Sequence, residues 1–411
     1  MDNGYLAKYF KGVACKKLSQ VEADAMKSNQ HEYNGDKGLK SLLGTNCGRI
    51  IFAASFMYLG DDGIVEAEGR MTWYDARENH PKRTEWRLYF PANEVTNKSE
   101  TGDTLYLCKK TDDTLLVIVA QRGSTFDGQM QWLFDINSAG NAGFIVKEKF
   151  VSDKKKIEYI ARIILEQIGI EYESDAGNNC LEDMIDRFGG KFPTTKEFSK
   201  YSRETVREVS PIEEPDETLL KWMNQEEALF RSLEKYIIEE RLRKGFIREN
   251  DVNVDEFIAF SLSVQNRRKS RVGLAFENHL EYLFIENSVQ YSRTPVTENK
   301  SKPDFIFPCI EAYRDRNYQS VYLTMLGVKS TCKDRWRQVL AEADRIGRKH
   351  LITIEAAISE NQTKEMKAKN VQLVLPREIH NTYLSSQREW LYSVEDFLKE
   401  VKEKQKYYQT L

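Results

Sequence analysis

The chain has 411 residues, which is too long for one ordinary domain, so two or three domains are expected. With 40% hydrophobic and 30% charged residues it has the composition of a globular protein, and no stretch reaches the roughly 20 uninterrupted apolar residues of a membrane helix. The six cysteines form no C-x-x-C pair, which argues against a zinc site and a disulfide framework, and the net charge of −3 gives no support to nonspecific nucleic-acid binding. The chain start lacks an apolar core of signal-peptide length, so we expect a cytoplasmic protein.

The N-terminal half predicts a β-domain. Between residues 49 and 136, short runs rich in β-branched and aromatic residues alternate with turn-forming segments. The predicted strands are RIIFAASFMYL, GRMTWY, TEWRLYFP, TLYLCKK, TLLVIVAQ and MQWLFDI. Their close spacing favours a barrel or a sandwich over βαβ units. Helices are predicted at 154–170 and 181–187.

A polar segment at 191–217 shows little apolar periodicity, and its later part, 203–217, is interpreted as an inter-domain linker. The predicted domains are therefore residues 1–202 and 218–411. The second has an α/β pattern, with helices at 218–243, 255–264, 272–287 and 333–347 and one near the C-terminus. Its strands are predicted at 304–308, 321–329, 350–355 and 371–375, which implies a central sheet flanked by helices. VYLTMLGV is almost continuously apolar, as expected for a strand buried on both faces.

Three residues of this α/β half are candidates for phosphodiester hydrolysis. Asp304 follows a proline at a strand start, Lys329 ends the buried strand, and Glu342 lies on the helix predicted next. That helix has an apolar stripe formed by Trp336, Val339, Leu340, Ala343 and Ile346, with Arg335, Gln338 and Glu342 along one edge. Thr331 and Asp334 fit a capping box at its start.

The chemistry explains why these residue types would occur together. Two carboxylates can hold Mg²⁺, which offsets the extra negative charge of the transition state and lowers the pKa of the attacking water. A lysine beside the scissile phosphate stabilises the same charge. Taken singly, Asp304 is a common turn residue, Lys329 a common solvated strand end and Glu342 a common surface residue, so the pattern alone is weak.

Residues 255–345 resemble the EcoRII-type restriction endonucleases of the PD-(D/E)xK nuclease superfamily. The stretches that carry the resemblance are VDEFIAFSLSVQNRRKSRVG, ENHLEYLFIEN, KPDFIFP and VKSTCKDRWRQVLAEAD. The superfamily's usual acid two residues before the lysine is replaced here by Gly327. The EcoRII-like subgroup takes its second carboxylate from a position thirteen residues after the lysine, which is Glu342 in this chain. The resemblance also implies that Glu277 is a further acidic residue of the site.

The same resemblance implies DNA contacts. Lys333, Asp334 and Arg335 would read a CC/GG sequence in the major groove, where arginine can bond guanine and a carboxylate can accept from cytosine. Arg267, Arg268, Lys269 and Arg271 would lie along phosphates, although a charge run is more often only a solvated face. Relatives flip bases into protein pockets, for which Trp222, Phe230 or Arg231 are candidates.

The N-terminal half more faintly resembles the B3-like pseudobarrel that binds a second, effector copy of the site. In KRTEWRLYF, strand alternation would place Arg83, Glu85 and Arg87 on one face, either to read bases or as an ordinary solvent face. Tyr74, Arg77 and Lys82 are weaker candidates on the same surface.

The function predicted from the sequence is that of a type II, Mg²⁺-dependent site-specific deoxyribonuclease. It would cut both strands of a short near-palindromic site, such as CCWGG, in a prokaryotic cytoplasm. The resemblance implies a restriction-modification system with a cognate methyltransferase, and a two-fold site favours a homodimer. The rival interpretations are an inactive sequence-specific DNA-binding regulator and a repair or structure-selective nuclease.

Overall fold

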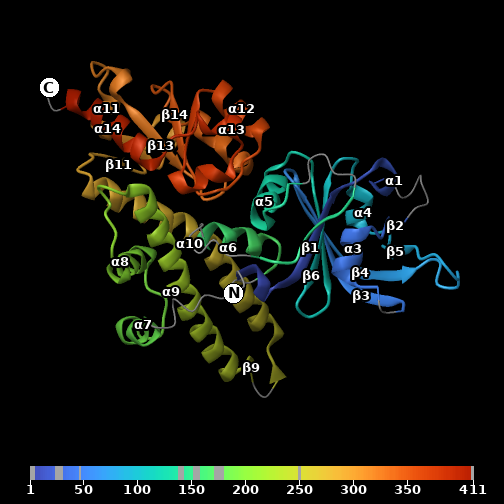
Figure 1. The fold of residues 1–411 in the computed structure, drawn as a ribbon. Coiled ribbons are helices and arrows are strands. Elements are labelled where there is room, and N and C mark those ends of the chain that lie inside the picture. Colours follow the sequence, from blue (N-terminus) through green and yellow to red (C-terminus); the bar gives the residue numbers. More distant parts are fainter. Residues whose placement is uncertain are drawn as a thin grey trace. The chain divides into compact units, whose positions relative to one another are not determined.

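The structure is a computed structural model of the chain, and it describes residues 5–23, 31–45, 48–137, 143–150, 158–170, 180–248 and 251–408. The chain divides into two compact units (Figure 1). The first comprises residues 1–156, 161–171 and 356–360, and the second comprises 157–160, 172–355 and 361–411. Within the described ranges, no helix is long and apolar enough to cross a membrane.

The first unit is built on a curled, open mixed sheet, which among its described residues has eight strands. The strand order is β2-β5-β4-β3-β7-β6-β1-β8, and β3 pairs with β7 in parallel while the other neighbours are antiparallel. The strands are β1 Phe10–Lys17, β2 Glu32–Asn34, β3 Ile50–Gly60, β4 Gly63–Asp75, β5 Trp86–Tyr89, β6 Thr104–Lys110, β7 Leu115–Ala120 and β8 Ile145–Lys147. The prediction of a mainly β N-terminal half is confirmed.

One predicted strand of this unit is wrong. Residues 130–136 were expected to be extended, but they belong mostly to the helix α5 (Thr125–Phe134). Ser124 caps the helix by accepting a hydrogen bond from the Asp127 N–H, and Asp135 ends it in the left-handed conformation. The N-cap residue Ser124 therefore precedes the apolar run at 130–136 that suggested a strand.

Short helices complete the first unit, and its core lies between them and the sheet. The core contains Trp73, Phe56 and Leu107. The helices are η1 Tyr5–Lys8, α1 Gln20–Ala23, α3 Lys37–Leu43 and α4 Glu94–Lys98. Of the helix predicted at 154–170, residues 154–157 lie outside the described residues, and the rest is observed as α6 (Glu158–Gln167), which belongs to this unit from Ala161 on.

The second unit has a mixed five-stranded sheet within the part of the chain that the structure describes, in the order β11-β12-β13-β14-β15. Strands β11, β12 and β13 are antiparallel, whereas β13, β14 and β15 are parallel. The bounds are β11 Ser292–Arg293, β12 Phe305–Phe307, β13 Thr324–Val328, β14 Lys349–Ile352 and β15 Val371–Val374. All four strands predicted for this half are present, and β13 is fully buried as expected.

Two long helices, α9 (Pro215–Lys244) and α10 (Val254–Glu286), pack against each other in this unit (Figure 1). The break that the sequence suggested between 264 and 272 does not occur, so α10 is continuous. A short ribbon of β9 (Ile247–Arg248) and β10 (Asp251–Val252) lies between the two helices along the chain. The remaining elements are η3 Glu298–Lys300, α11 Ile310–Arg314, η4 Ser320–Tyr322, α12 Glu360–Ala368, η6 Arg377–Thr382, α13 Ser385–Arg388 and α14 Val394–Tyr408.

The structure draws the boundary between the units earlier than the predicted limit at residue 202. The helices α7 (Leu181–Phe188) and α8 (Thr195–Thr205) belong to the second unit, where Phe198 and Tyr201 share an apolar cluster with Phe230 of α9. A capping box between Thr194 and Glu197 starts α8. The predicted linker 203–217 thus begins inside α8 and ends inside α9.

Candidate active site

Asp304 and Lys329 lie side by side because their strands are neighbours. Asp304 precedes β12, which pairs with β13 so that Phe305 faces Leu326, and Lys329 follows β13 directly. The Asp304 carboxylate accepts hydrogen bonds from the Val328 N–H at 2.6 Å and from the Lys329 Nζ at 3.3 Å. Both side chains are mostly buried, with 18% and 17% exposure. The structure therefore brings together two residues that the sequence proposed for catalysis.

Glu342 also lies close enough to interact electrostatically with this pair, although it is not on an α-helix. The element at Lys333–Ala341 is a 3-10 helix, η5, and Glu342 follows it with extended backbone angles (φ −102°, ψ 144°). Burial, and then the negative charge of Asp304, raise the pKa of Glu342 to about 7, while Lys329 acts in the opposite direction. The Oε2 atom is buried and has no hydrogen-bond partner. A buried carboxylate oxygen without a donor is costly, and a cation is one way to satisfy it.

Gly327 explains why the usual acid two residues before the lysine is missing. A Cβ atom at Gly327 would lie 2.7 Å from the Val339 Cγ2 atom, because η5 packs directly on β13. Val339 is fully buried there. A carboxylate at 327 is therefore excluded by packing, and the segment that excludes it is the one that leads to Glu342.

Glu277 is the third acidic residue near the site, on α10. Burial and the Asp304 charge raise its pKa, and a hydrogen bond of 3.0 Å from the Arg293 Nη2 opposes that rise. Arg293 also bonds the Glu281 carboxylate at 2.7 Å and the Asn278 side-chain oxygen at 3.0 Å. Sequence reasoning missed Arg293, because its partners are separated from it in the chain and only the β11–α10 packing joins them.

The donor set suits a hard cation with few protein ligands. Among the described residues, no group of three or more His, Cys, Asp or Glu side chains is gathered closely enough to hold a metal ion. Asp304 and Glu342 supply carboxylate oxygens, and Mg²⁺ commonly binds through one or two carboxylates while keeping several waters. The residues therefore fit Mg²⁺ and do not fit a closed structural metal centre.

The expected base-reading segment lies at the start of η5. Arg335 is exposed there, while the side chains of Lys333 and Asp334 lie outside the described residues. Thr331 is not the N-cap residue expected for the capping box, because Cys332 occupies that position; the Asp334 half of the expected box lies outside the described residues.

The basic run on α10 divides into exposed and buried residues. Arg267 and Lys269 are exposed, whereas the guanidinium of Arg268 bonds the Glu234 carboxylate at 2.7 Å. Arg271 departs from its expected role at a phosphate, because it is only 7% exposed and pairs with Glu226 at 3.3 Å and with Glu227.

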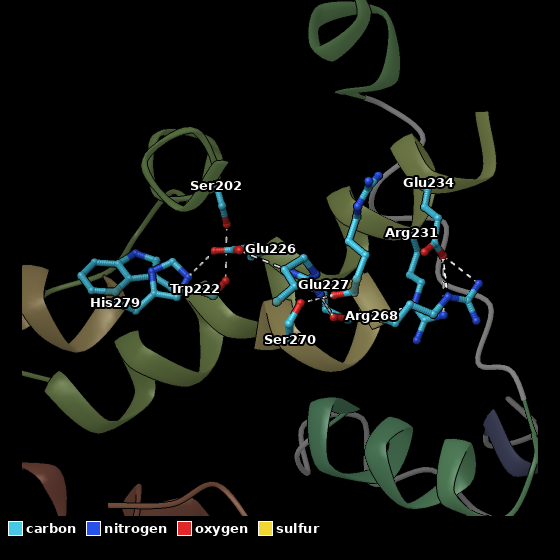
Figure 2. A network of polar contacts seen from close by, with 11 residues as sticks. Ser202, Trp222, Glu226, Glu227, Arg231, Glu234, Arg268, Ser270 and His279 are labelled. Atoms are coloured by element: carbon cyan, nitrogen blue, oxygen red, sulfur yellow. Dashed lines mark hydrogen bonds and ion pairs between the residues drawn. The ribbon is translucent and has the colours of Figure 1, made fainter. Parts of the chain in front are cut away.

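Figure 2 shows that these pairs belong to a longer polar network between α9 and α10. The His279 Nε2 also lies 2.9 Å from the Glu226 carboxylate, and the Arg231 Nε donates to Glu227 at 2.7 Å. Burial lowers the pKa of His279, although Glu226 opposes that shift. This interior face of the helix pair is a structural charge network.

The candidates for a base pocket have different environments. Trp222 and Phe230 are both 2% exposed, and Arg231 is held by Glu227. Phe230 lines a cavity of about 220 Å³ together with Phe192, Phe198, Arg267, Ser270 and Arg271.

In the first unit, the structure gathers most of the predicted DNA-reading residues. Glu85 bonds both Arg77 and Arg87 at 2.5 Å, and Arg87 also bonds Glu32 at 2.6 Å. Tyr74 donates to the same Glu32. Only Arg87 is within β5, however, so the expected alternation on one strand is incomplete, and Arg83 and Lys82 are exposed in the preceding loop.

Comparisons with known proteins agree with the resemblance seen in the sequence. Residues 230–398 match the family described as EcoRII C terminal. The type II restriction enzyme EcoRII of Escherichia coli is 41% identical over 212 residues, which cover 51% of this chain and 51% of that enzyme. The match thus spans about half the length of this curated relative.

Among solved structures, metal-depleted Ecl18kI in complex with uncleaved DNA is similar with a TM-score of 0.45 and 19% identity, covering 57% of this chain and 87% of that one. The PspGI–substrate DNA complex is similar with a TM-score of 0.40 and 15% identity, covering 56% of this chain and 93% of that one. In sequence, this chain is therefore similar to the type II restriction enzyme EcoRII over about half of its length, and the match to the EcoRII C-terminal family lies within its second half, at residues 230–398.

Proposed function

We propose that the chain is a Mg²⁺-dependent type II restriction endonuclease that hydrolyses both strands of a short CC/GG-containing DNA site, such as CCWGG. The observation that carries the proposal is the juxtaposition of Asp304, Lys329 and Glu342, in which the Glu342 Oε2 is buried without a partner. The homology to a type II restriction enzyme supports the reaction class.

Each residue has a chemical role in this proposal. Asp304 and Glu342 would hold Mg²⁺, which supplies positive charge at the phosphate and lowers the pKa of the attacking water. The Lys329 ammonium, already 3.3 Å from Asp304, would stabilise the charge that develops on the phosphoryl oxygens. Glu277, whose carboxylate is held by Arg293, would be a further acidic group at the edge of the site. Arg335, Lys333 and Asp334 would read bases, and Arg267 and Lys269 would contact phosphates.

The test is a digest of a many-site plasmid with Mg²⁺, comparing the wild type with Asp304→Ala and Lys329→Ala. Asp186→Ala is a matched control, because Asp186 is exposed on α7. Discrete fragments from the wild type and the control alone would support the proposal. A smear would favour a structure-selective nuclease, and DNA binding without cleavage would favour a regulator.

We further propose that the active form is a homodimer joined through the first half of α10. Val254, Phe257, Ile258 and Leu262 follow helical spacing yet are 47–58% exposed. A second copy would cover this apolar stripe with an identical one, as in a two-fold interface. Light scattering of wild type and Ile258→Glu tests this: the variant should be monomeric, and an unchanged dimer would contradict the interface.

The first unit is proposed to be a B3-like effector domain that binds a second copy of the site through Arg83, Glu85 and Arg87. The cluster of Arg77, Glu85 and Arg87 supports this role by placing charged groups on one surface. In the full chain, a short duplex carrying the site should stimulate cleavage of a one-site plasmid, and Arg83→Ala with Arg87→Ala should remove the stimulation. Equal cleavage with and without the duplex would argue against an effector site.

A further inference from the structure

The backbone just after Glu342 has an unusual conformation. Ala343 has φ +50°, in the left-handed region, and is 1% exposed. A non-glycine residue in this conformation is strained and persists only when its surroundings enforce it. Because Glu342 is not held within an α-helix, the contacts that enforce this turn also decide where its carboxylate lies.

Lys349 makes those contacts. It is the first residue of β14, is 6% exposed, and its Nζ donates to the Ala343 carbonyl oxygen at 2.5 Å and to the Glu342 carbonyl oxygen. One ammonium therefore bridges two consecutive carbonyls, those of the peptide groups before and after the Ala343 Cα atom. Hydrogen bonds from a charged donor are roughly twice as strong as neutral ones.

The lysine is itself fixed by the sheet. Lys349 pairs with Val371 of β15, and its N–H donates to the Asn370 carbonyl oxygen at 3.1 Å. The next residue, His350, is in register with Leu326 of β13, the strand that leads to Lys329. The contacts of Lys349 therefore fix the Glu342 peptide relative to the same sheet that positions the rest of the site.

We propose that Lys349 is a positioning residue, which holds the left-handed turn at Ala343 so that the Glu342 carboxylate faces Asp304. This inference rests on the proposed function, since it assigns Lys349 to the site in which Asp304 and Glu342 hold Mg²⁺. Without the ammonium, the Glu342 carbonyl loses the Lys349 donor and the Ala343 carbonyl keeps only the Ile346 N–H. Ala343 can then relax to an ordinary conformation, which would carry the Glu342 side chain away.

The test replaces Lys349 with methionine in the full chain and measures Mn²⁺ binding by the electron paramagnetic resonance signal of free Mn²⁺. Loss of a group that orients a metal ligand typically weakens metal affinity roughly 10- to 100-fold, and we expect a loss in this range. The Mg²⁺ concentration for half-maximal cleavage should rise in parallel, while the rate at saturating Mg²⁺ largely recovers. Lys349→Arg, which keeps a charged donor, should restore most of the affinity.

Lys147→Met is the matched control. The Lys147 Nζ donates to the carbonyl oxygen of Asp135, a residue that also has φ +50°. Asp135 lies at the end of α5 in the first unit, so this contact does not belong to the candidate site. This variant should bind Mn²⁺ like the wild type. If Lys349→Met does not fold, Lys349→Gln keeps a buried neutral donor and should show the same loss in weaker form.

The outcomes separate the two proposals. A wild type that binds no Mn²⁺ and cleaves no DNA would refute the proposed function itself. A wild type that binds Mn²⁺ while the folded Lys349 variants bind it equally well would refute only the positioning role. A loss of thermal stability with unchanged Mn²⁺ affinity would reduce Lys349 to a structural residue.

Discussion

Replacing Arg271 distinguishes a structural charge network from a DNA contact. The guanidinium is 7% exposed, pairs with Glu226 and Glu227, and lies 3.9 Å from the Phe230 ring centroid. Removing one partner of a buried ion pair costs about 3–5 kcal/mol. Glu226 would keep His279, and Glu227 would keep another arginine of α9. We therefore expect Arg271→Met to cost about 3 kcal/mol, at the lower end of that range.

The assay combines thermal unfolding with the salt dependence of DNA binding. A cost of about 3 kcal/mol should lower the Tm of the second unit by roughly 6–12 °C for a domain of its size. The slope of log K against log salt should not change, since no phosphate contact is lost. The comparison is Arg267→Met, which removes an exposed residue of the same run and should reduce that slope by about 1 with little change in Tm. An Arg271→Met protein of normal Tm and reduced slope would refute this reasoning.

Three further predictions follow from the packing and the buried ionisable groups. Gly327→Ala should destabilise the second unit by about 1–3 kcal/mol in urea unfolding, because the new Cβ would press on Val339, and unchanged stability would show that η5 yields easily. With the pKa of Glu342 raised to about 7, protons compete with Mg²⁺, so the half-saturating Mg²⁺ concentration for cleavage should fall as pH rises from 6 to 8, and a flat profile would contradict this. Burial lowers the pKa of His350 despite the opposing charge of Glu400. Folding thus favours the neutral form of the His350 imidazole. The contribution of His350 to the free energy of unfolding is therefore present above about pH 6.5 and is lost as the pH falls below that value. His350→Gln should therefore reduce the fall in Tm between pH 7.5 and 5.5, and an equal fall in both proteins would refute the assignment.

The sequence predicted those parts of the fold that have local signals. β13 was found from its apolar run, and α9 from its periodicity. The helix α8 was missed although its signals were present, because Thr194, Glu197 and Phe198 form a capping box followed by the start of an apolar stripe. For α5, a compact apolar run suggested a strand, since short apolar runs do not distinguish the two structures by periodicity.

The site was predictable only in part, for a physical reason. Asp304 and Lys329 lie at the ends of two recognisable strands, so topology brings them together once the strands pair. The region of Glu342 was expected to be an α-helix, but the close packing of η5 on Gly327 favours a tighter helix that ends before the glutamate. Lys349 and Arg293 act on groups that only the tertiary fold brings near them. No motif could have identified either residue.

The hydrogen bond from the Lys329 N–H to the Ile352 carbonyl oxygen, at 3.0 Å, has a consequence for the cell that makes this protein. It ties the end of β13 to a strand that leaves the ribosome later, and Lys349, which we propose holds the Glu342 turn, is the first residue of that same strand. A nascent chain that stops before β14 contains every acidic candidate and the lysine, yet lacks the frame that aligns them. If the chain acts as the nuclease proposed above, a fragment that stops before β14 would therefore not cleave the DNA of its host.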